Sequence, residues 1–232
     1  MISIVIPTFN EENFIEKTLI RLSALKKEAD FEIIVTDGKS TDRTTTLAGT
    51  YAKVVTADKG KGRQLNAGAN HATGDILFFV HADMYLPGGA LNKIEQVINI
   101  DGYDGGGFVN EFSSHNRKIK RLSSLLSTLL INRSSRNKNI FYGDNGIFVR
   151  KDVFHSLGGF KEIPIMEDYD FSFRLKSSYK VYEIIQPPLI VDPRRLLKDG
   201  CAKTIMKWIL IKKFYLMGVP PHKLTAWYKD TR

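Results

Sequence analysis

Cysteine is nearly absent from this sequence of 232 residues, because Cys201 is the only one. A single cysteine excludes a disulfide framework and a cysteine-rich zinc site, which fits a reducing compartment. Long hydrophobic runs are also missing, since none approaches the roughly 20 apolar residues that span a bilayer. The first residues, Met1–Phe9, lack the basic start of a signal peptide and have the character of a strand. We therefore expect a cytoplasmic protein that does not span a membrane.

Several catalytic motifs are absent or incomplete. Gly38-Lys39-Ser40 resembles the end of a Walker A motif, but the glycine required five residues earlier is Ile33. Gly60-Lys61-Gly62 begins like the dinucleotide pattern GxGxxG, which then ends in Leu65. Neither HExxH nor GxSxG occurs. These absences disfavour P-loop kinases, Rossmann dehydrogenases, zinc proteases and α/β-hydrolases.

Acidic residues are outnumbered by basic ones. The chain has 34 Lys and Arg against 25 Asp and Glu, a net charge of +9. A positively charged protein favours anionic partners such as nucleotides, nucleic acid or acidic lipid headgroups, and the sign of the charge does not choose among them. The hydrophobic share of 43% is ordinary for a soluble globular protein, so the chain can bury a sizeable core.

Short apolar runs alternate with segments of helical spacing along the first half of the chain. This alternation predicts βαβ units and an α/β fold with a mostly parallel central sheet flanked by helices. We treat residues 1–197 as one domain and residues 198–232 as a helical C-terminal tail packed on it. The expected strands are Ile2–Ile6, Glu32–Thr36, Lys53–Thr56, Asp75–Val80, Phe108–Phe112 and Ile147–Arg150. The expected helices after Asp83 are Pro87–Ile98, the amphipathic Arg117–Ile131, and one that begins near Glu167.

Acids and amides follow three of the predicted strands at the point where each ends. The first strand leads into Pro7–Glu12, the second into Asp37-Gly38, and the fourth into His81-Ala82-Asp83. Ligands of parallel α/β sheets bind at the carboxyl ends of strands. Each segment could also be an ordinary surface loop, but their recurrence at strand ends predicts a ligand site at this edge.

Asp83 is the candidate metal ligand. Mg²⁺ and Mn²⁺ favour oxygen ligands and are commonly held by one or two carboxylates plus substrate phosphates. His81 could contact the ribose or the metal, or only stabilise the turn.

Two further segments are candidates for binding an anionic ligand and for accepting the proton of a reacting hydroxyl. Lys59–Arg63 offers cations and a helix N-terminus to an anion, with a solvated basic loop as the alternative. Glu167-Asp168 could supply a general base, with acids that complement a helix dipole as the alternative. Asp37 could accept a hydrogen bond from a nucleobase or only turn the chain.

The ordered motifs IVIPTFNEE, VTDGKSTD, GKGRQLNAG, FFVHAD, GDNGIFVRKDVF and IMEDYDFSFRL resemble the family-two glycosyltransferases of the GT-A fold, which is Rossmann-like. The resemblance runs from Ile2 to about Leu175 and is closest to a small bacterial branch with an HAD metal motif. It implies an inverting enzyme that moves one sugar from a nucleotide-diphosphate sugar, most commonly a UDP-sugar, to an acceptor hydroxyl. By resemblance, Asp168 is the general base, Glu167 supports it or contacts the acceptor, and Asp83 holds Mn²⁺ or Mg²⁺. The residues implied to bind the nucleotide sugar are Pro7, Thr8, Phe9, Glu11, Asp37, Arg63 and His81.

Two departures from the family pattern qualify these expectations. His81 replaces the first acid of the usual DxD motif, and Gln186 is followed by Pro187-Pro188-Leu189 instead of completing QxxRW. The second departure favours hexosyltransferase-type transfer of a single sugar over polymerisation. A nucleotidyltransferase and a non-catalytic nucleotide or membrane-surface binding module are the alternatives.

The expected partners are a nucleotide-sugar donor and an unidentified hydroxyl acceptor, with a lipid-linked acceptor as a candidate, and no nucleic acid. The tail segment Ile205–Met217 mixes lysines with apolar residues nearly all round its helix. It could pack on the domain, on a second subunit in a homo-oligomer, or on an anionic membrane surface at the inner face.

Overall fold

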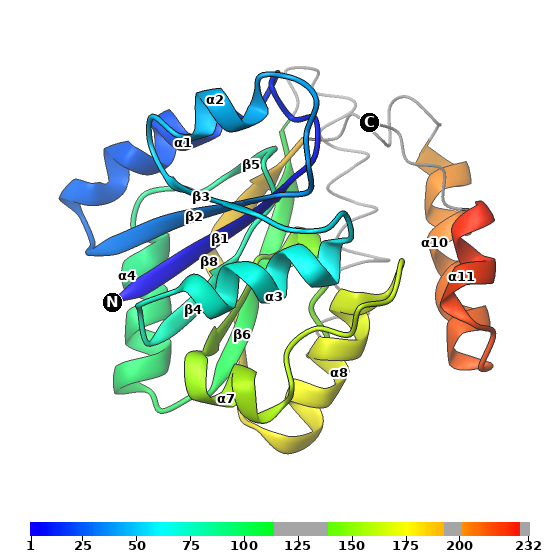
Figure 1. The fold of residues 1–232 in the computed structure, drawn as a ribbon. Coiled ribbons are helices and arrows are strands. Elements are labelled where there is room, and N and C mark those ends of the chain that lie inside the picture. Colours follow the sequence, from blue (N-terminus) through cyan, green and yellow to red (C-terminus); the bar gives the residue numbers. More distant parts are fainter. Residues whose placement is uncertain (114–138, 193–200, 228–232) are drawn as a thin grey trace.

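The computed structural model describes residues 1–113, 139–192 and 201–227 (Figure 1). The predicted helix Arg117–Ile131 lies outside the described residues. Within those ranges, eight strands form one sheet in the order β3-β2-β1-β4-β7-β6-β8-β5. The strands are β1 (Ile2–Thr8), β2 (Phe31–Asp37), β3 (Lys53–Thr56), β4 (Ile76–Phe79), β5 (Met84–Tyr85), β6 (Gly105–Phe112), β7 (Ile147–Arg150) and β8 (Val181–Val191).

The predicted fold class is confirmed. β1 pairs in parallel with β2 and β4, and β2 pairs in parallel with β3. β7 is antiparallel to both β4 and β6, and the short β5 is antiparallel to β8. The main helices are α1 (Ile15–Ala24), α2 (Thr44–Ala48), α3 (Lys61–His71), α4 (Ala90–Glu95), α7 (Lys151–Ser156), α8 (Glu167–Ser178), α10 (Cys201–Leu216) and α11 (Pro221–Leu224).

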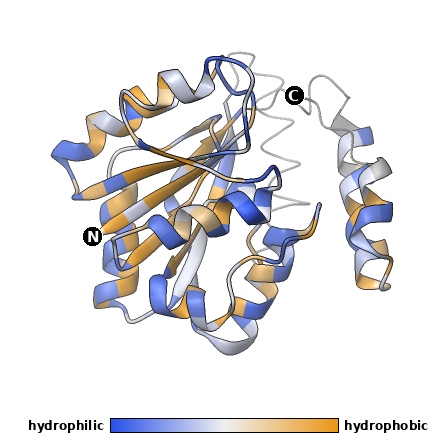
Figure 2. Cartoon of the chain, viewed as in Figure 1, coloured by the Kyte–Doolittle hydropathy of each residue, from blue (hydrophilic) through white to orange (hydrophobic). Residues whose placement is uncertain are grey.

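Helices cover both faces of the sheet, which explains why its strands are apolar without alternation. On β1, Ile4 contributes to the core under α1, α2 and α4, while Val5 contributes to the core under α3, α7 and α8 (Figure 1). Figure 2 shows mostly hydrophobic residues along the strands and a mixture of hydrophobic and hydrophilic residues along the helices. The carboxyl ends of β1, β2 and β4 therefore lie side by side at one edge of the sheet, between the helices that cover its two faces.

β6 is longer than the predicted strand Phe108–Phe112. It begins at Gly105, so Gly105–Gly107 belongs to the strand. A Cβ on Gly106 would clash with the carbonyl oxygen of Tyr182 on β8, so only glycine allows the two strands to approach this closely. β8 was not predicted, because Pro187 and Pro188 in its middle argue against a strand.

The predicted tail is helical, and one side of it contacts the domain. Ile211 of α10 and Leu224 of α11 are buried with Ile165, Met166 and Tyr169. The predicted helix Pro87–Ile98 is shorter at its start, because α4 begins at Ala90 and continues as a π-helical turn, Gln96–Ile100.

Candidate active site

Asp37 ends β2 and is almost fully buried, with 2% of its surface exposed. Its carboxylate accepts hydrogen bonds from Thr8 Oγ1 (3.2 Å), Ser40 N (2.7 Å) and Ser40 Oγ (2.5 Å). These bonds fix the turn after β2 and tie it to the end of β1. A carboxylate has about four acceptor positions, so Asp37 can shape the turn and still accept one more donor.

Gln64 clamps the same two strand ends, and the sequence motifs did not single it out. From α3, its side-chain Nε2 donates to the carbonyl oxygens of Thr8 (2.7 Å) and Thr36 (2.9 Å). Gly38 allows this approach, since a Cβ there would lie 3.1 Å from the Gln64 side chain. The GKGRQ motif contained the residue, but only the fold shows that its amide lies beneath the edge of the sheet.

The loops after β1 and β2 are joined by further hydrogen bonds. Asn10 N donates to Ser40 Oγ (2.8 Å), and Thr41 N donates to Asn10 Oδ1 (2.9 Å). Glu11, with 5% of its surface exposed, donates its backbone N–H to Thr44 Oγ1 (2.8 Å). Asn10 has a positive φ of 54°, a conformation that asparagine tolerates better than most residues. Pro7, Thr8, Phe9 and Glu11 therefore lie on one preformed loop platform with Asp37.

The three basic side chains before and within α3, Lys59, Lys61 and Arg63, contact three different parts of the site. Lys59 Nζ lies 3.6 Å from the centre of the Phe9 ring, a cation–π contact at the platform. Arg63 Nε lies 2.9 Å from Glu162 Oε2, and both side chains are about half exposed. Lys61 Nζ lies 3.7 Å from Glu167 Oε1. The segment thus links the predicted nucleotide side of the site to the acid pair.

The turn after β4 is held from α1. Thr18 Oγ1 donates to the carbonyl oxygen of Ala82 (2.5 Å), which fixes the backbone between His81 and Asp83. His81 Nδ1 lies 3.2 Å from Asp144 Oδ1, and Asp83 is half-buried. Across the described ranges, no three His, Cys, Asp or Glu side chains cluster as a metal cage. Asp83 brings one carboxylate to this turn, and Mg²⁺ and Mn²⁺ are commonly held by one or two carboxylates plus substrate phosphates.

Glu167 and Asp168, at the first turn of α8, occupy different environments. Glu167 is buried, with 5% of its surface exposed. Burial, followed by the charge of Asp168, raises the pKa of Glu167 to about 7, while Lys61 acts in the opposite direction. Asp168 is half-buried, and its carboxylate accepts the backbone N–H groups of Gly143 (2.7 Å, to Oδ2) and Tyr169 (2.7 Å, to Oδ1).

A small pocket joins the turn after β4 to this acid pair. Its polar lining comes from Lys61, His81, Gly143 and Asp168, and its apolar lining comes from Leu65, Phe79, Val80, Ile147 and Phe160. Gly143 lies between the two functional groups, since a Cβ there would lie 2.8 Å from His81 Nε2 and 3.3 Å from Asp168 Oδ2. Side chains that are 87 positions apart in the chain (168 − 81) thus share one recess.

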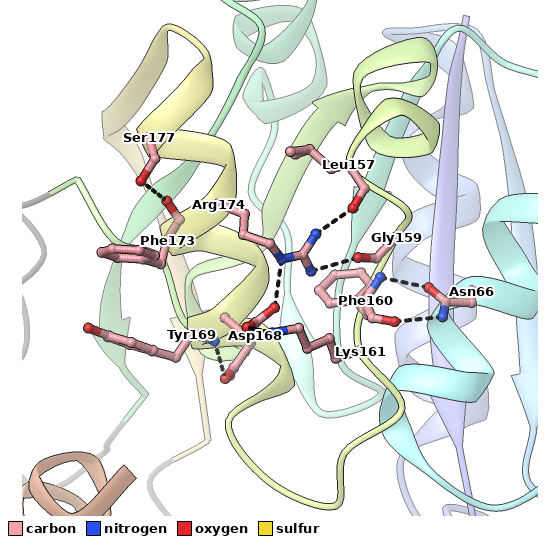
Figure 3. A network of polar contacts seen from close by, with 11 residues as sticks. Asn66, Leu157, Gly159, Phe160, Lys161, Asp168, Tyr169, Phe173, Arg174 and Ser177 are labelled. Atoms are coloured by element: carbon pink, nitrogen blue, oxygen red, sulfur yellow. Dashed lines mark hydrogen bonds and ion pairs between the residues drawn. The ribbon is translucent and has the colours of Figure 1, made fainter. Parts of the chain in front are cut away.

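A polar network behind the acid pair holds the loop that precedes α8 (Figure 3). Arg174 donates to Asp170 Oδ2 (2.7 Å) and to the carbonyl oxygens of Leu157 (2.6 Å) and Gly159 (2.8 Å). Asn66 of α3 exchanges two hydrogen bonds with the backbone of Phe160, at 2.8 and 2.9 Å. The network fixes the distance between α3, which carries Lys61, and α8, which carries the acids.

The profile of Glycosyl transferase family 2 matches residues 3–158 of the chain, from β1 into the loop after α7. The chain belongs to this family. The family membership confirms the resemblance seen in the motifs and favours a glycosyltransferase over the nucleotidyltransferase alternative.

Curated relatives of this family 2 chain carry glycosyltransferase names. Dolichyl N-acetyl-alpha-D-glucosaminyl phosphate 3-beta-D-2,3-diacetamido-2,3-dideoxy-beta-D-glucuronosyltransferase of Methanococcus voltae is 28% identical and aligns with 92% of this chain and 75% of its own length. Undecaprenyl-phosphate 4-deoxy-4-formamido-L-arabinose transferase of Enterobacter sp. (strain 638) is 26% identical over 64% of this chain and 47% of its own length.

Two solved structures show the fold of the family 2 chain. Staphylococcus aureus TarS 1–349, in complex with UDP-GlcNAc, superposes with a TM-score of 0.63 at 18% identity, over 82% of this chain and 58% of that one. The mannosyltransferase PcManGT of Pyrobaculum calidifontis, in complex with GDP-Man and Mn²⁺, superposes with a TM-score of 0.64 at 18% identity, over 93% of this chain and 63% of that one. The chain thus spans less than two thirds of both solved relatives, and at this identity they establish the GT-A fold alone.

Proposed function

We propose that this chain transfers a single hexosyl unit from a nucleotide-diphosphate sugar to an acceptor hydroxyl, with inversion at the anomeric carbon. The observation that carries the proposal is the pocket shared by His81, at the end of β4, and Asp168, at the start of α8. Family membership, together with relatives solved in complex with UDP-GlcNAc and with GDP-Man, supports a nucleotide-sugar donor. A UDP-sugar is the first donor to test.

The donor is proposed to lie across the carboxyl edge of β1, β2 and β4. The preformed platform of Pro7, Thr8, Phe9 and Glu11 would receive the base and ribose, with Asp37 accepting one further hydrogen bond. Lys59 on Phe9 and the N-terminus of α3 bring positive charge to the diphosphate side. Arg63, which is paired with Glu162 and half exposed, would have to leave that partner to reach the donor.

Asp168 is proposed as the general base. Its carboxylate lines the pocket and is oriented by two backbone N–H groups. As the acceptor oxygen bonds to the anomeric carbon, its proton passes to a carboxylate oxygen of Asp168, and the bond from that carbon to the diphosphate breaks. Glu167 is proposed to position this turn through its buried contact with Lys61 rather than to touch substrate.

Asp83 is proposed to hold Mn²⁺ or Mg²⁺ against the donor diphosphate, with His81 beside it on the turn. A divalent cation at this position would stabilise the negative charge that develops on the leaving diphosphate. The Mn²⁺ bound together with GDP-Man in PcManGT supports this assignment. The names of the dolichyl and undecaprenyl-phosphate relatives support a lipid-linked acceptor.

The test of the base is Asp168→Asn. The variant should bind a UDP-sugar with Mn²⁺ as the parent does, while turnover falls by about 10²–10⁴-fold, the usual contribution of a general base. Asp75→Asn, the same change at an acid with 92% side-chain exposure next to the other end of β4, is the matched control and should keep its turnover. Undiminished transfer by Asp168→Asn would remove Asp168 as the base. Donor binding without any transfer by the parent would favour the binding-module alternative.

The test of the metal is Asp83→Ala, read out by donor binding. In the parent, adding Mn²⁺ should increase the thermal stabilisation produced by one nucleotide sugar, since a ligand of the native state stabilises it. The variant should lose this metal-dependent increment. Asp75→Ala, which removes an acid with 92% side-chain exposure next to the other end of β4, should keep it. An unchanged increment in Asp83→Ala would show that the metal assignment is wrong.

A further inference from the structure

The outward face of α10 is an apolar stripe that no described part of the protein covers. Its members recur at helical spacing, and each has at least 40% of its surface exposed. They are Met206 (60%), Ile209 (53%), Leu210 (40%) and Leu216 (60%), with Met217 (67%) directly after the end of the helix. We call these residues, together with the exposed Lys203 and Lys213, the outer face of α10.

The opposite side of the same helix is used by the domain. Thr204 and Ile211 are 3% and 2% exposed, and Trp208 packs against the main core. Tyr215 meets Tyr169 of α8 with ring centres 5.9 Å apart. α10 is therefore apolar on two opposite sides. Packing on the domain explains the apolar residues of its inner side but not those of its outer face. Figure 2 shows hydrophobic and hydrophilic residues mixed along α10.

Charge on this part of the chain has one sign. Residues 201–227 contain five lysines and neither Asp nor Glu. Lys212 is directed inward, over the rings of Tyr142 (5.5 Å) and Tyr169 (5.3 Å). Lys203 and Lys213 are exposed, and at helical spacing they fall on the same side as the apolar stripe. An apolar stripe with lysines and no acids is complementary to a lipid bilayer that has an apolar interior and anionic headgroups.

We propose that the outer face of α10 docks on an anionic lipid bilayer. The apolar side chains would enter the headgroup boundary, and the lysines would extend to lipid phosphates while their stems stay on the apolar surface. A second copy of the chain fits this face less well. A twofold interface pairs the same patch with itself, so the lysines would meet lysines with no acid to compensate them. Among the described residues no helix has the length and hydrophobicity to cross a bilayer.

Docking in this orientation would place the acid pair near the lipid surface. The inner side of α10 contacts Tyr169, the residue that follows Asp168 on α8. An acceptor hydroxyl on a lipid-linked molecule would then meet Asp168 without leaving the bilayer surface. This link between docking and acceptor rests on the proposed function, whereas docking itself does not.

The test uses the full chain and vesicles, without donor or acceptor. Binding to phosphatidylcholine vesicles that contain phosphatidylglycerol is measured by flotation and by the fluorescence of the only two tryptophans, Trp208 and Trp227. The parent should bind these vesicles, bind pure phosphatidylcholine weakly, and be released by high salt. The double variant Ile209→Ser/Leu210→Ser should bind at least about tenfold more weakly, because it removes two large apolar contacts. Lys203→Gln/Lys213→Gln should weaken binding to the anionic vesicles by about fivefold per lysine.

Two matched controls separate this face from general hydrophobicity and charge. Ile185→Ser, on the exposed part of β8, removes an isoleucine with 52% exposure and should leave vesicle binding unchanged. Lys176→Gln, on exposed α8 surface, should also leave it unchanged. All variants should keep the parent's thermal unfolding midpoint, since every changed side chain is exposed.

Three outcomes would overturn the proposal. They are no binding of the parent to anionic vesicles, unchanged binding of Ile209→Ser/Leu210→Ser, and a dimer of the parent in sedimentation equilibrium that this double variant dissociates. The last outcome would make the face an interface between copies. If the chain binds vesicles but transfers no sugar, membrane docking stands and the proposed function is refuted. If it transfers sugar to a soluble acceptor but does not bind vesicles, the proposed function stands and membrane docking is refuted.

Discussion

At the residue scale, the two neighbouring carboxylates Glu167 and Asp168 have separate environments. Helical geometry turns consecutive side chains about 100° apart, so one faces the interior and Lys61 while the other faces the pocket. Glu167 is buried beside Lys61, whereas the carboxylate of Asp168 is held by the N–H groups of Gly143 and Tyr169. This division supports a positioning role for Glu167 and a chemical role for Asp168.

The raised pKa of Glu167 predicts a specific dependence of stability on pH. Its folded pKa, about 7, lies above the ordinary value of 4.5, so the folded state holds this proton more tightly than the unfolded state. The contribution of Glu167 to the stability of the fold therefore falls as pH rises from about 4.5 to 7 and changes no further above that range. The shift corresponds to at most roughly 3 kcal/mol.

Glu167→Gln should remove this contribution. Thermal unfolding between pH 4.5 and 8 should show the variant gaining stability relative to the parent as pH rises. A constant or opposite difference for Glu167→Gln would contradict the prediction.

At the scale of elements, α3 connects the parts of the site. Gln64 holds the ends of β1 and β2, Asn66 holds the loop at Phe160, and Lys61 reaches Glu167. Gly62 permits this arrangement, since a Cβ there would clash with the carbonyl oxygen of Lys161. Neither backbone can move away without breaking the hydrogen bonds of Asn66. The position of α3 is therefore set by polar contacts as much as by the apolar core.

Gly62→Ala should therefore destabilise the fold by about 1–3 kcal/mol, the usual range for an overpacked site. Urea unfolding measures the change. Gly49→Ala is the matched control, because Gly49 has a φ of −61° and its nearest contact to an added Cβ is at 3.4 Å. Alanine there should be neutral or slightly stabilising, since it restricts the unfolded chain. Equal effects of the two variants would show that α3 has room to shift.

At the scale of the whole molecule, the tail helices extend the structure beyond the sheet and its layers. The cluster of Ile140, Ile165, Met166, Tyr169, Ile211 and Leu224 joins α10 and α11 to the start of α8. The division into a domain of residues 1–197 and a tail of residues 198–232 stays a prediction. The contacts of the cluster couple the stability of the tail to the segment that carries the acid pair.

Ile211→Ala should loosen this junction, at a cost of about 2–5 kcal/mol for a buried isoleucine. Because opening of one unit can be local, amide exchange should accelerate in α10 and at the start of α8 while β1 and β4 keep their protection. Ile209→Ala changes the same residue type two positions earlier, where 53% of the side chain is exposed, and should leave exchange unchanged. Equal exchange in both variants would show that the tail is not held by this cluster.

The sequence by itself determined the alternation of strands and helices in the first half of the chain and the polar segments at three strand ends. Both are local properties, because a strand covered on two faces must be apolar along its length and a polar segment then marks its end. The motifs also identified the family, which was confirmed.

Only the tertiary structure decided which of these polar residues face each other. The pairing of Lys61 with Glu167, the clamp by Gln64 and the shared pocket of His81 and Asp168 join segments far apart in the sequence, and local periodicity carries no information on such contacts. The same holds for β8 and α10. Whether a strand accepts two prolines, and which side of an apolar helix is covered, depends on the neighbours that the fold places beside it.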